Sequence, residues 1–408
     1  MNRRGDAASP PLLSQQIESL VPEAIDVLRR CCAPCGLKGS AGSPGHNQIW
    51  ARDSMISLLG ARLVEDAAIH AALEASLATL RRHQTPAGAI PNHVDAVTGA
   101  PNFRAYADAG LWYVIGSALL RPDSDSIQQV LRWYACQDVD SADLISIQEA
   151  SDWEDLLCVR GKGLYVNCLY VLALRRAAAL AETQGQTDEA LLYCDRAESV
   201  SSAINQVLWY GGDGQMLRHI AASFSTPNPE HDSLGRPRWM PQKRLLVDSH
   251  YYLPYVSFRE PGEWFDSFGN LLAILTGVAD AAQTAHILDL IRHNRVASPP
   301  IRAIHPPIER GTPDWREYYG TTNLPHCHHN GGIWPFLGGF YVAALVKAQR
   351  YDEAESALEA LAALNRSGGF CEWHHGQTAG PLGVRGQAWS AGMFLFAREC
   401  VASRTVLL

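Results

Sequence analysis

Carboxylates and tryptophans alternate in several short stretches along the 408-residue chain. The candidate acids in these stretches are Asp53, Asp108, Glu149, Asp152, Glu154, Asp155, Glu263, Asp266 and Glu372. Hydrolysis of a glycosidic bond needs one protonated carboxyl to donate to the leaving oxygen and one ionised carboxylate to activate water or attack. Tryptophan faces stack well on sugar rings. The combination therefore indicates chemistry on a carbohydrate.

The same stretches supply a set of polar and aromatic side chains that we predict to bind the substrate. The set consists of Trp50, Arg52, Asp53, Asp108, Trp112, Asp266, His329, Asn330, Trp334, Arg385, Gln387 and Trp389. A carboxylate near a helix start is often an N-cap that accepts backbone N–H bonds, which is the alternative for Asp53 and Asp266. For residues 149–155 the alternative is a solvated acidic face, but Trp153, Leu156 and Leu157 lie among or beside these acids.

Two clusters have the residue types of a metal site. Cys31, Cys32 and Cys35 include a C-x-x-C spacing, but no second pair with matching spacing exists. His326 to His329 reads HCHH, and sequence neighbours seldom share a coordination sphere without a helical i, i+4 partner. We expect no metal and no cofactor.

Apolar residues recur at intervals of three and four in twelve segments, which predicts helices. The segments are 14–30, 53–64, 66–82, 105–119, 123–136, 163–184, 186–209, 265–278, 281–292, 331–348, 351–364 and 386–402. Alternate segments open with related short signatures, as repeats of one supersecondary unit do. We predict an all-α (α/α)6 barrel, a six-hairpin toroid with long active-site loops at one end, as a single domain over residues 1–408. The role of residues 210–265, an insertion in this repeat, stays open, and residues 1–12 are expected to be flexible.

Composition excludes several classes of protein. The formal charge of −8 without a basic run argues against nucleic-acid binding. The N-terminus lacks the apolar core of a secretory signal, and no apolar run reaches the roughly 18 residues of a membrane span, so we expect a cytoplasmic protein that binds no membrane. The ten cysteines are mostly isolated, so no disulfide framework is expected. A homo-oligomer is allowed.

Residues 329–336, HNGGIWPF, resemble the HNGG-x-WP signature of the alkaline/neutral invertases. Residues 108–112 (DAGLW), 267–271 (SFGNL) and 385–389 (RGQAW) are similar to further motifs of that family, in the same order. Arg52-Asp53 resembles the W-x-R-D sequence of glucoamylase-, trehalase- and debranching-type barrels. The resemblance implies an inverting acid–base pair, with Asp152 as acid and Glu372 as base; Glu154 and Asp155 remain alternative acids.

If Arg52 and Asp53 bind sugar hydroxyls and Asp108, Trp112, His329 and Gln387 complete the sugar pocket, little room is left inward for a second sugar, so we expect exo-cleavage of a small α-glucoside. The resemblance makes sucrose the first candidate. Another glucobiose or glucosyl conjugate is the nearest alternative. Barrels of this architecture also host histidine-based sugar epimerases or isomerases, for which His250, His329 and His375 are candidates. A carbohydrate-binding toroid without catalysis is the third alternative.

Overall fold

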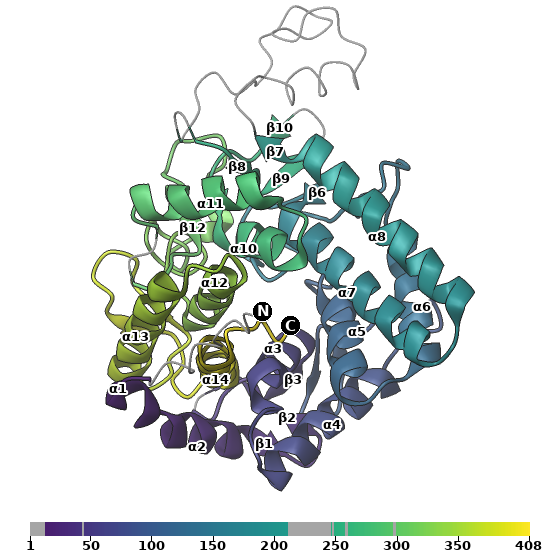
Figure 1. Cartoon of the computed structure of the whole chain (residues 1–408), viewed down its shortest axis with the longest axis horizontal. Coiled ribbons are helices and arrows are strands. Elements are labelled where there is room, and N and C mark those ends of the chain that lie inside the picture. The colour runs from purple at the N-terminus through teal and green to yellow at the C-terminus, as the bar shows by residue number, and fades with distance from the viewer. Residues whose placement is uncertain (1–12, 43–44, 211–245, 247–248, 258–259, 297–298) are drawn as a thin grey trace, which may run out of the picture.

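The computed structural model describes residues 13–42, 45–210, 246, 249–257, 260–296 and 299–408. Within this part of the chain, helices form two concentric rings (Figure 1). The inner ring consists of α3 (Ala51–Ala61), α5 (Ala109–Leu120), α7 (Leu164–Thr183), α10 (Ser267–Thr276), α12 (Pro335–Lys347) and α14 (Ala388–Ser403). The outer ring consists of α2 (Val21–Cys31), α4 (Ala67–Arg82), α6 (Ser124–Ala135), α8 (Thr187–Val207), α11 (Ala281–His293) and α13 (Tyr351–Gly368). The short α1 (Gln15–Glu18) lies against α13.

The inner ring is closed. Each inner helix packs on the next, from α3 through α5, α7, α10 and α12 to α14, and α14 packs back on α3. Helices α3 and α10 are buried at every position, which is why their apolar residues run all round the helix. The outer helices bury one face only; α13, for example, buries Leu358 and Leu361 and exposes Asp352 and Glu359. The predicted (α/α)6 barrel is thus confirmed.

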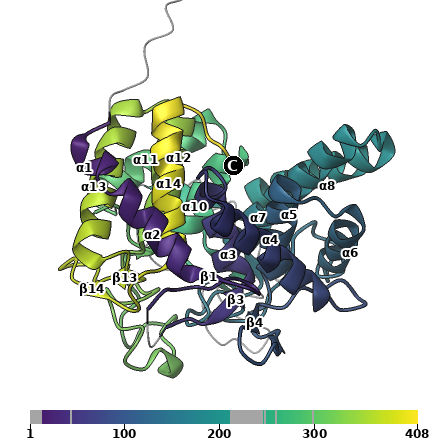
Figure 2. The ribbon, with the colours of Figure 1, turned by 90° about the horizontal axis from the view of Figure 1, so that it is seen from below.

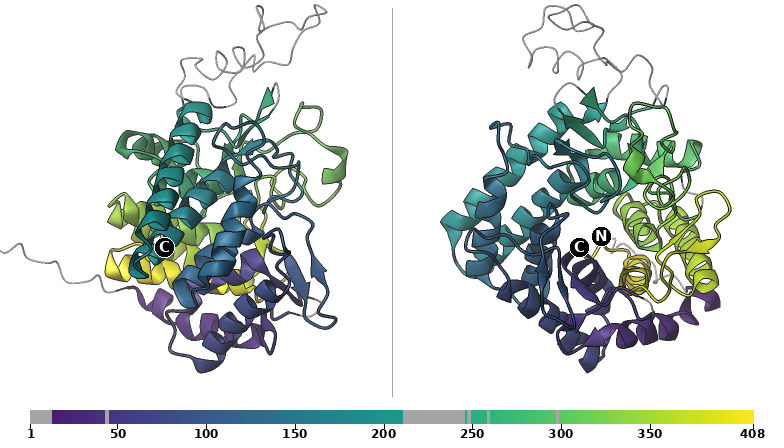
Figure 3. Two further views of the ribbon diagram at one scale, coloured as in Figure 1. Left: turned by 90° about the vertical axis from the view of Figure 1, so that its right-hand side faces the viewer. Right: turned by 180° about the vertical axis from the view of Figure 1, so that it is seen from behind.

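Short antiparallel strands precede or follow the helices. They are β1 (Cys32–Ala33), β2 (Gly36–Leu37), β3 (Gln48–Trp50), β4 (His93–Asp95), β5 (Pro101–Asn102), β6 (Lys162–Gly163), β7 (Trp209–Tyr210), β8 (Tyr251–Tyr252), β9 (Tyr255–Ser257), β10 (Glu260–Pro261), β11 (Phe265–Asp266), β12 (Ile304–His305), β13 (Trp373–His374) and β14 (Pro381–Leu382). A 3₁₀ turn, η1, spans Glu317–Tyr319. Strands β3, β6 and β11 lead directly into α3, α7 and α10. Figure 2 and Figure 3 show that such loops gather at one end of the ring.

All twelve predicted helical segments overlap a helix, but some boundaries are wrong. The segment 14–30 is two helices, because α1 ends at Glu18 and α2 restarts with Pro22 in its first turn. The segment 331–348 begins too early, since α12 starts only at Pro335. Residues 1–12 and most of the insertion, 211–245, lie outside the described residues, so the expectations about them stay untested.

Helix α7 is long and apolar enough to cross a bilayer by length and composition alone. In the structure 78% of its most apolar window is buried. Its apolar character is therefore explained by its place in the inner ring, where α5, α8 and α10 pack on it.

The contact between α3 and α14 depends on two glycines. A Cβ at Gly60 would lie 1.9 Å from the carbonyl oxygen of Gly392, and a Cβ at Gly392 would lie 2.6 Å from that of Ser57.

Gly60→Ala should lower the free energy of unfolding by about 3 kcal/mol, the upper end of the range for overpacking a core. Urea unfolding followed by circular dichroism measures this, and an unchanged midpoint would contradict the close helix contact.

Candidate active site

A cavity of about 430 Å³ opens among the loops that enter the inner helices. Its lining residues are His46, Trp50, Arg52, Asp53, Asn92, His93, Asn102, Arg104, Ala105, Trp153, Asp155, Leu156, His328, His329, Trp334, Glu372 and Trp389. They come from loops far apart in the chain that the ring brings together. Of the predicted substrate-binding residues, the structure brings Trp50, Arg52, Asp53, His329, Trp334 and Trp389 to this cavity, together with Glu372.

An aromatic cluster lies at and below the floor of the cavity. Trp153 packs edge-on against Trp334 and Phe336, with ring centroids 5.8 Å and 5.5 Å apart. Phe336 in turn stacks on Trp389 at 4.2 Å. These rings come from the loop before α7 and from the starts of α12 and α14, so the indoles that line the cavity are held by tight packing below them.

Arg52 is fixed by an ion pair beneath the cavity. Its Nη1 donates to both carboxylate oxygens of Asp108, at 3.1 and 2.9 Å. The Tyr165 hydroxyl donates to Asp108 Oδ2 at 2.9 Å and accepts from the Trp112 indole at 2.7 Å. Asp108 and Trp112 do not line the cavity, contrary to the prediction that they complete a sugar pocket. Their contacts instead hold the Arg52 guanidinium in place.

Glu372 stands at the start of the β13–β14 hairpin. Its backbone N–H donates to the Val384 carbonyl at 2.8 Å, and its Oε2 accepts from the Val384 N–H at 3.1 Å. A Cβ at Gly383, where φ is +67°, would lie 2.5 Å from Oε2, so the hairpin needs glycine there. Burial alone raises the pKa of Glu372, but the hydrogen bond and charge of His46 outweigh it and hold the pKa below its ordinary value. Glu372 is therefore ionised near neutral pH.

Asp155 lines the same cavity, whereas Asp152 does not. Burial, with smaller contributions from the charges of Asp108 and Glu372, raises the pKa of Asp155 against the opposing charge of Arg52. Asp152 is only 1% exposed, and its Oδ1 accepts from the Glu154 N–H at 2.9 Å. Burial and the charge of Asp108 raise the pKa of Asp152 to about 8. Since Glu154 is also 1% exposed, the alternative of a solvated acidic face for this segment is wrong.

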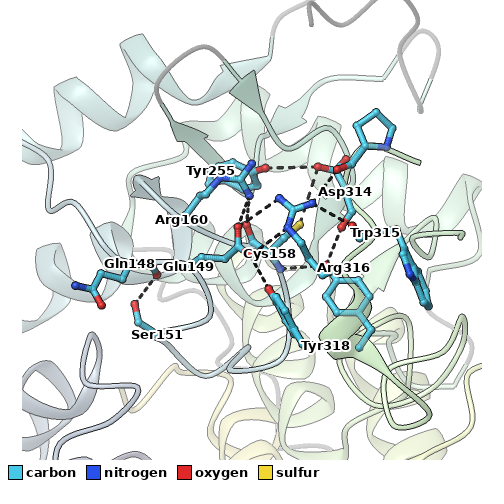
Figure 4. Close-up of polar contacts among 12 residues, drawn as sticks. Gln148, Glu149, Ser151, Cys158, Arg160, Tyr255, Asp314, Trp315, Arg316 and Tyr318 are labelled. Carbon is cyan, nitrogen blue, oxygen red and sulfur yellow. Dashed lines mark hydrogen bonds and ion pairs between the residues drawn. The ribbon is translucent and has the colours of Figure 1, made fainter. Parts of the chain in front are cut away.

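Figure 4 shows the contacts that hold the loop carrying Asp155. Glu149, at the start of the loop, accepts from Arg160 at 2.9 Å, from Arg316 at 3.1 Å and from the Tyr318 hydroxyl at 2.9 Å. Near its middle, the Leu156 carbonyl accepts from the Asn323 amide at 2.6 Å. The segment around η1 thus fixes the loop before α7.

Four other predicted site residues also lie outside the lining of the cavity. Asp266 is the N-cap of α10 and accepts from the Phe268 and Gly269 N–H groups, which was the alternative for it. The Asn330 side chain is bonded to backbone groups of Ile308 and Asn323 within its own loop region. Arg385 is exposed, and Gln387 is buried at the N-cap of α14. Asp53 lines the cavity and does not cap α3.

Several cavity residues were not predicted, namely His46, Asn92, His93, Asn102, Arg104, Ala105 and Leu156. His93 and Asn102 belong to the β3–β4–β5 sheet, which begins with the strand that ends at Trp50, so this sheet carries them to the same place. These residues could have been found only by predicting that the short segment 48–50 pairs with 93–95. Nothing in the helical periodicity indicates it.

Buried polar atoms without a protein partner surround the cavity. Among the lining residues they are Trp50 Nε1, Arg52 Nε, Asn92 Oδ1, His93 Nδ1, Trp153 Nε1, His328 Nδ1, His329 Nδ1 and Trp389 Nε1. Buried polar groups normally form hydrogen bonds, and an unpaired one costs free energy. Donors and acceptors interleaved with indole faces are suited to a ligand that carries many hydroxyl groups.

The metal alternatives gain no support. Among the described residues, no group of three or more His, Cys, Asp or Glu side chains lies close enough to hold an ion. The sulfurs of Cys31, Cys32 and Cys35 contact the carbonyls of Gly386, Leu28 and Ala96, three separate places. All ten cysteines are free thiols.

Asp152 gives a test of the buried acids behind the cavity. The unfolded chain releases the Asp152 proton near its ordinary pKa of 3.8, and the folded chain only near 8. Stability therefore falls as pH rises between these values, since the folded state binds more protons there. Asp152→Asn removes this penalty. The melting temperature of the variant minus that of wild type should therefore be larger at about pH 8 than at about pH 5. Calorimetry at both pH values measures it, and a constant difference would contradict the burial argument.

Comparisons with known proteins agree with the fold and the motifs. A family model described as alkaline and neutral invertase matches residues 123–403, and one described as amylo-alpha-1,6-glucosidase matches residues 23–139. Neutral/alkaline invertase 3, chloroplastic, of Oryza sativa subsp. japonica is 24% identical over 466 residues, covering 97% of this chain and 75% of that protein. Probable alkaline/neutral invertase D of Arabidopsis thaliana is 26% identical over 257 residues, covering 59% of this chain. The chain spans only 47% of the length of that protein.

Solved structures share the barrel. The GH63 mannosylglycerate hydrolase of Thermus thermophilus in complex with glucose superposes with a TM-score of 0.64 at 15% identity, covering 92% of this chain and 99% of that one. A bacterial glucoamylase complexed with acarbose gives a TM-score of 0.59 at 15% identity, covering 95% of this chain and 56% of that one. At such identities the likeness concerns the fold. Because the invertase model spans more than half of the sequence, the chain belongs to the alkaline and neutral invertase family.

Proposed function

We propose that this protein is an inverting glycoside hydrolase in which Asp155 is the general acid and Glu372 the general base. The observation that carries the proposal is that, of the three carboxyl groups that line the cavity, Asp155 and Glu372 lie in opposite environments. The pKa of Asp155 is raised by burial, and that of Glu372 is held low by His46 and the Val384 N–H. Pairs whose environments push their pKa values apart are those that divide acid and base roles.

The proposed acid differs from Asp152, the residue that the family resemblance implies. Asp152 is three residues away in the same loop, is buried, and does not line the cavity. Asp155 was an open alternative, and its place in the cavity favours it. Glu154 is buried like Asp152 and is disfavoured for the same reason.

In the proposed reaction, the protonated Asp155 carboxyl donates its proton to the glycosidic oxygen as the bond to the anomeric carbon breaks. Ionised Glu372 takes a proton from a water molecule, whose oxygen attacks the anomeric carbon from the opposite face. The configuration at that carbon inverts. Trp50, Trp153, Trp334 and Trp389 provide apolar faces for the sugar, and Arg52 and Asp53 bind its hydroxyls.

For the substrate we propose a small α-glucoside cleaved from its end, with sucrose as the first candidate and another glucobiose or glucosyl conjugate as the alternative. The aromatic floor closes the cavity below. Such a cavity suits a substrate with one sugar bound inside and a short leaving group toward the opening. The named relatives are invertases, whereas the solved barrel cited above is named as a mannosylglycerate hydrolase. We further propose a single-domain cytoplasmic enzyme. Relatives carry cytosolic, chloroplastic and mitochondrial names.

A histidine-based epimerase is the second candidate, favoured by His328 and His329, which line the cavity. Burial lowers the pKa of His328 to about 4 and holds that of His329 well below its ordinary value, so both imidazoles are neutral near pH 7. Of the three histidines predicted for this role, His250 and His375 do not line the cavity. An epimerase would leave every glycosidic bond intact.

Incubation with sucrose, trehalose and other unlabelled glucobioses tests the proposed function. We expect glucose release from at least one, with β-glucose as the first anomer in proton NMR spectra of an α-glucoside digest. Release of α-glucose first would contradict the water-activating role of Glu372. A changed sugar without bond cleavage would support the epimerase, and binding without turnover a non-catalytic toroid.

Three matched amide variants test the carboxylate roles. Asp155→Asn and Glu372→Gln should each lower kcat on the best substrate by about 10²- to 10⁴-fold, as loss of a general acid or base does. Asp152→Asn, in the same loop, should keep kcat within a few-fold because its side chain is away from the cavity. Circular dichroism and melting temperature establish folding. The reverse order, with Asp152→Asn inactive and Asp155→Asn active, would restore Asp152 as the acid.

A further inference from the structure

His46 contacts the proposed base from the opposite end of the chain. Its Nε2 lies 3.3 Å from Glu372 Oε1. Glu372 Oε2 is bonded to the Val384 N–H at 3.1 Å. Each carboxylate oxygen therefore has one donor, and only the partner of Oε1 can change its charge. The His46 side chain is 35% exposed and that of Glu372 is 16% exposed, so the contact is at the wall of the cavity.

The loop that carries His46 is built to hold it there. The Ser40 hydroxyl accepts from the His46 N–H at 2.8 Å. The Ala41 N–H donates to the Gly386 carbonyl at 2.9 Å, and the Ala388 N–H to the Gly39 carbonyl at 3.0 Å. The loop before α3 is thus joined by backbone hydrogen bonds to the loop before α14, in which Glu372 stands. These backbone hydrogen bonds bring His46 and Glu372 into contact.

Close packing leaves the imidazole little freedom. A Cβ at Gly39 would lie 3.0 Å from the His46 Cβ and 3.1 Å from Asp53 Oδ1, so glycine lets the loop approach both. The indole of Trp50 packs edge-on against the imidazole, with centroids 6.3 Å apart.

The charged and titratable groups that face His46 come from four parts of the fold. They are Glu372 before α14, Asp53 on α3, Asp155 before α7 and His328 before α12. The hydrogen bond to Glu372 and the charges of the acids raise the pKa of His46 against the opposing effect of burial. His328 stays neutral because burial lowers its pKa to about 4. His46 is therefore the imidazole beside Glu372 whose protonated, positively charged form is favoured by its surroundings.

We infer that His46 is a positioning residue for Glu372, and that its positive charge, rather than hydrogen bonding alone, keeps this carboxylate ionised and oriented for water activation. The inference rests on the proposed role of Glu372 as base. A base that works only when ionised fails once it is protonated, which sets the acid limb of the pH profile. Removing the neighbouring cation makes Glu372 easier to protonate, so the acid limb moves to higher pH.

Substitutions at His46 separate charge from hydrogen bonding. His46→Gln keeps a donor but no charge and should move the acid limb of kcat/KM up by about one pH unit, the lower end of the effect of a neighbouring charge. At a pH below the acid limbs of both wild type and His46→Gln, a shift of one pH unit makes the variant about tenfold slower than wild type. His46→Lys keeps the charge and should leave the limb near its wild-type position. KM should change less than kcat in His46→Gln.

His93→Gln is the matched control, because it removes another imidazole from the same cavity that does not contact Glu372. Its activity can fall, but its acid limb should not move. An unmoved limb in His46→Gln, or equal shifts in His46→Gln and His46→Lys, would overturn the inference.

NMR titration of the imidazole protons, without substrate, separates this inference from the proposed function. The His46 resonance is assigned by its absence in His46→Gln. It should titrate with a pKa above the ordinary histidine value, and this pKa should fall when Glu372 is replaced by Gln. That result in a protein that cleaves no glucoside would support the His46–Glu372 pair and refute the proposed hydrolase. Cleavage of glucosides with a His46 titration that is the same in Glu372→Gln would support the hydrolase and overturn the pair.

Discussion

Closure of the inner ring is the constraint on which the rest of the structure depends. Helix α3 meets α14 through Gly60 and Gly392, where no Cβ fits on either side. This contact draws the loop of His46, Trp50 and Arg52 against the loop of Glu372, although these loops lie at opposite ends of the sequence. An open ring would leave each loop as an exposed, mostly irregular segment. The cavity, the low pKa of Glu372 and the indole-lined floor all exist because the first and last inner helices pack together.

Much of this architecture is predictable from the sequence because it is encoded locally. Helical periodicity marks both rings, and the inner helices are recognisable because their apolar residues leave no polar face, as in α3 and α12. Residues next to an inner helix start, such as Arg52 and Trp334, reach the cavity because the helix itself aims them. The family motifs give the same order of elements, and the matching of residues 123–403 agrees with them.

The remaining features depend on contacts between distant residues. In the irregular loop before α7, a step of three residues separates buried Asp152 from Asp155 in the cavity wall. Which one faces inward is set by the bonds of Glu149 and Leu156 to Arg316 and Asn323, both 167 residues away in sequence. Asp108 was predicted as a sugar ligand because its residue type suits one, but Arg52 occupies both of its oxygens. Residue type alone does not distinguish a ligand-binding carboxylate from one already paired inside the protein.

In the proposed mechanism, Asp155 and Glu372 face one anomeric carbon from opposite sides. A crystal structure of the Asp155→Asn variant with an uncleaved glucoside measures this directly. We expect the amide that replaces the Asp155 carboxyl to lie within hydrogen-bonding distance of the glycosidic oxygen, and a water molecule to lie between Glu372 and the anomeric carbon. A bound glucoside whose glycosidic oxygen contacts Asp152, or whose anomeric carbon lies far from Glu372, would contradict the account.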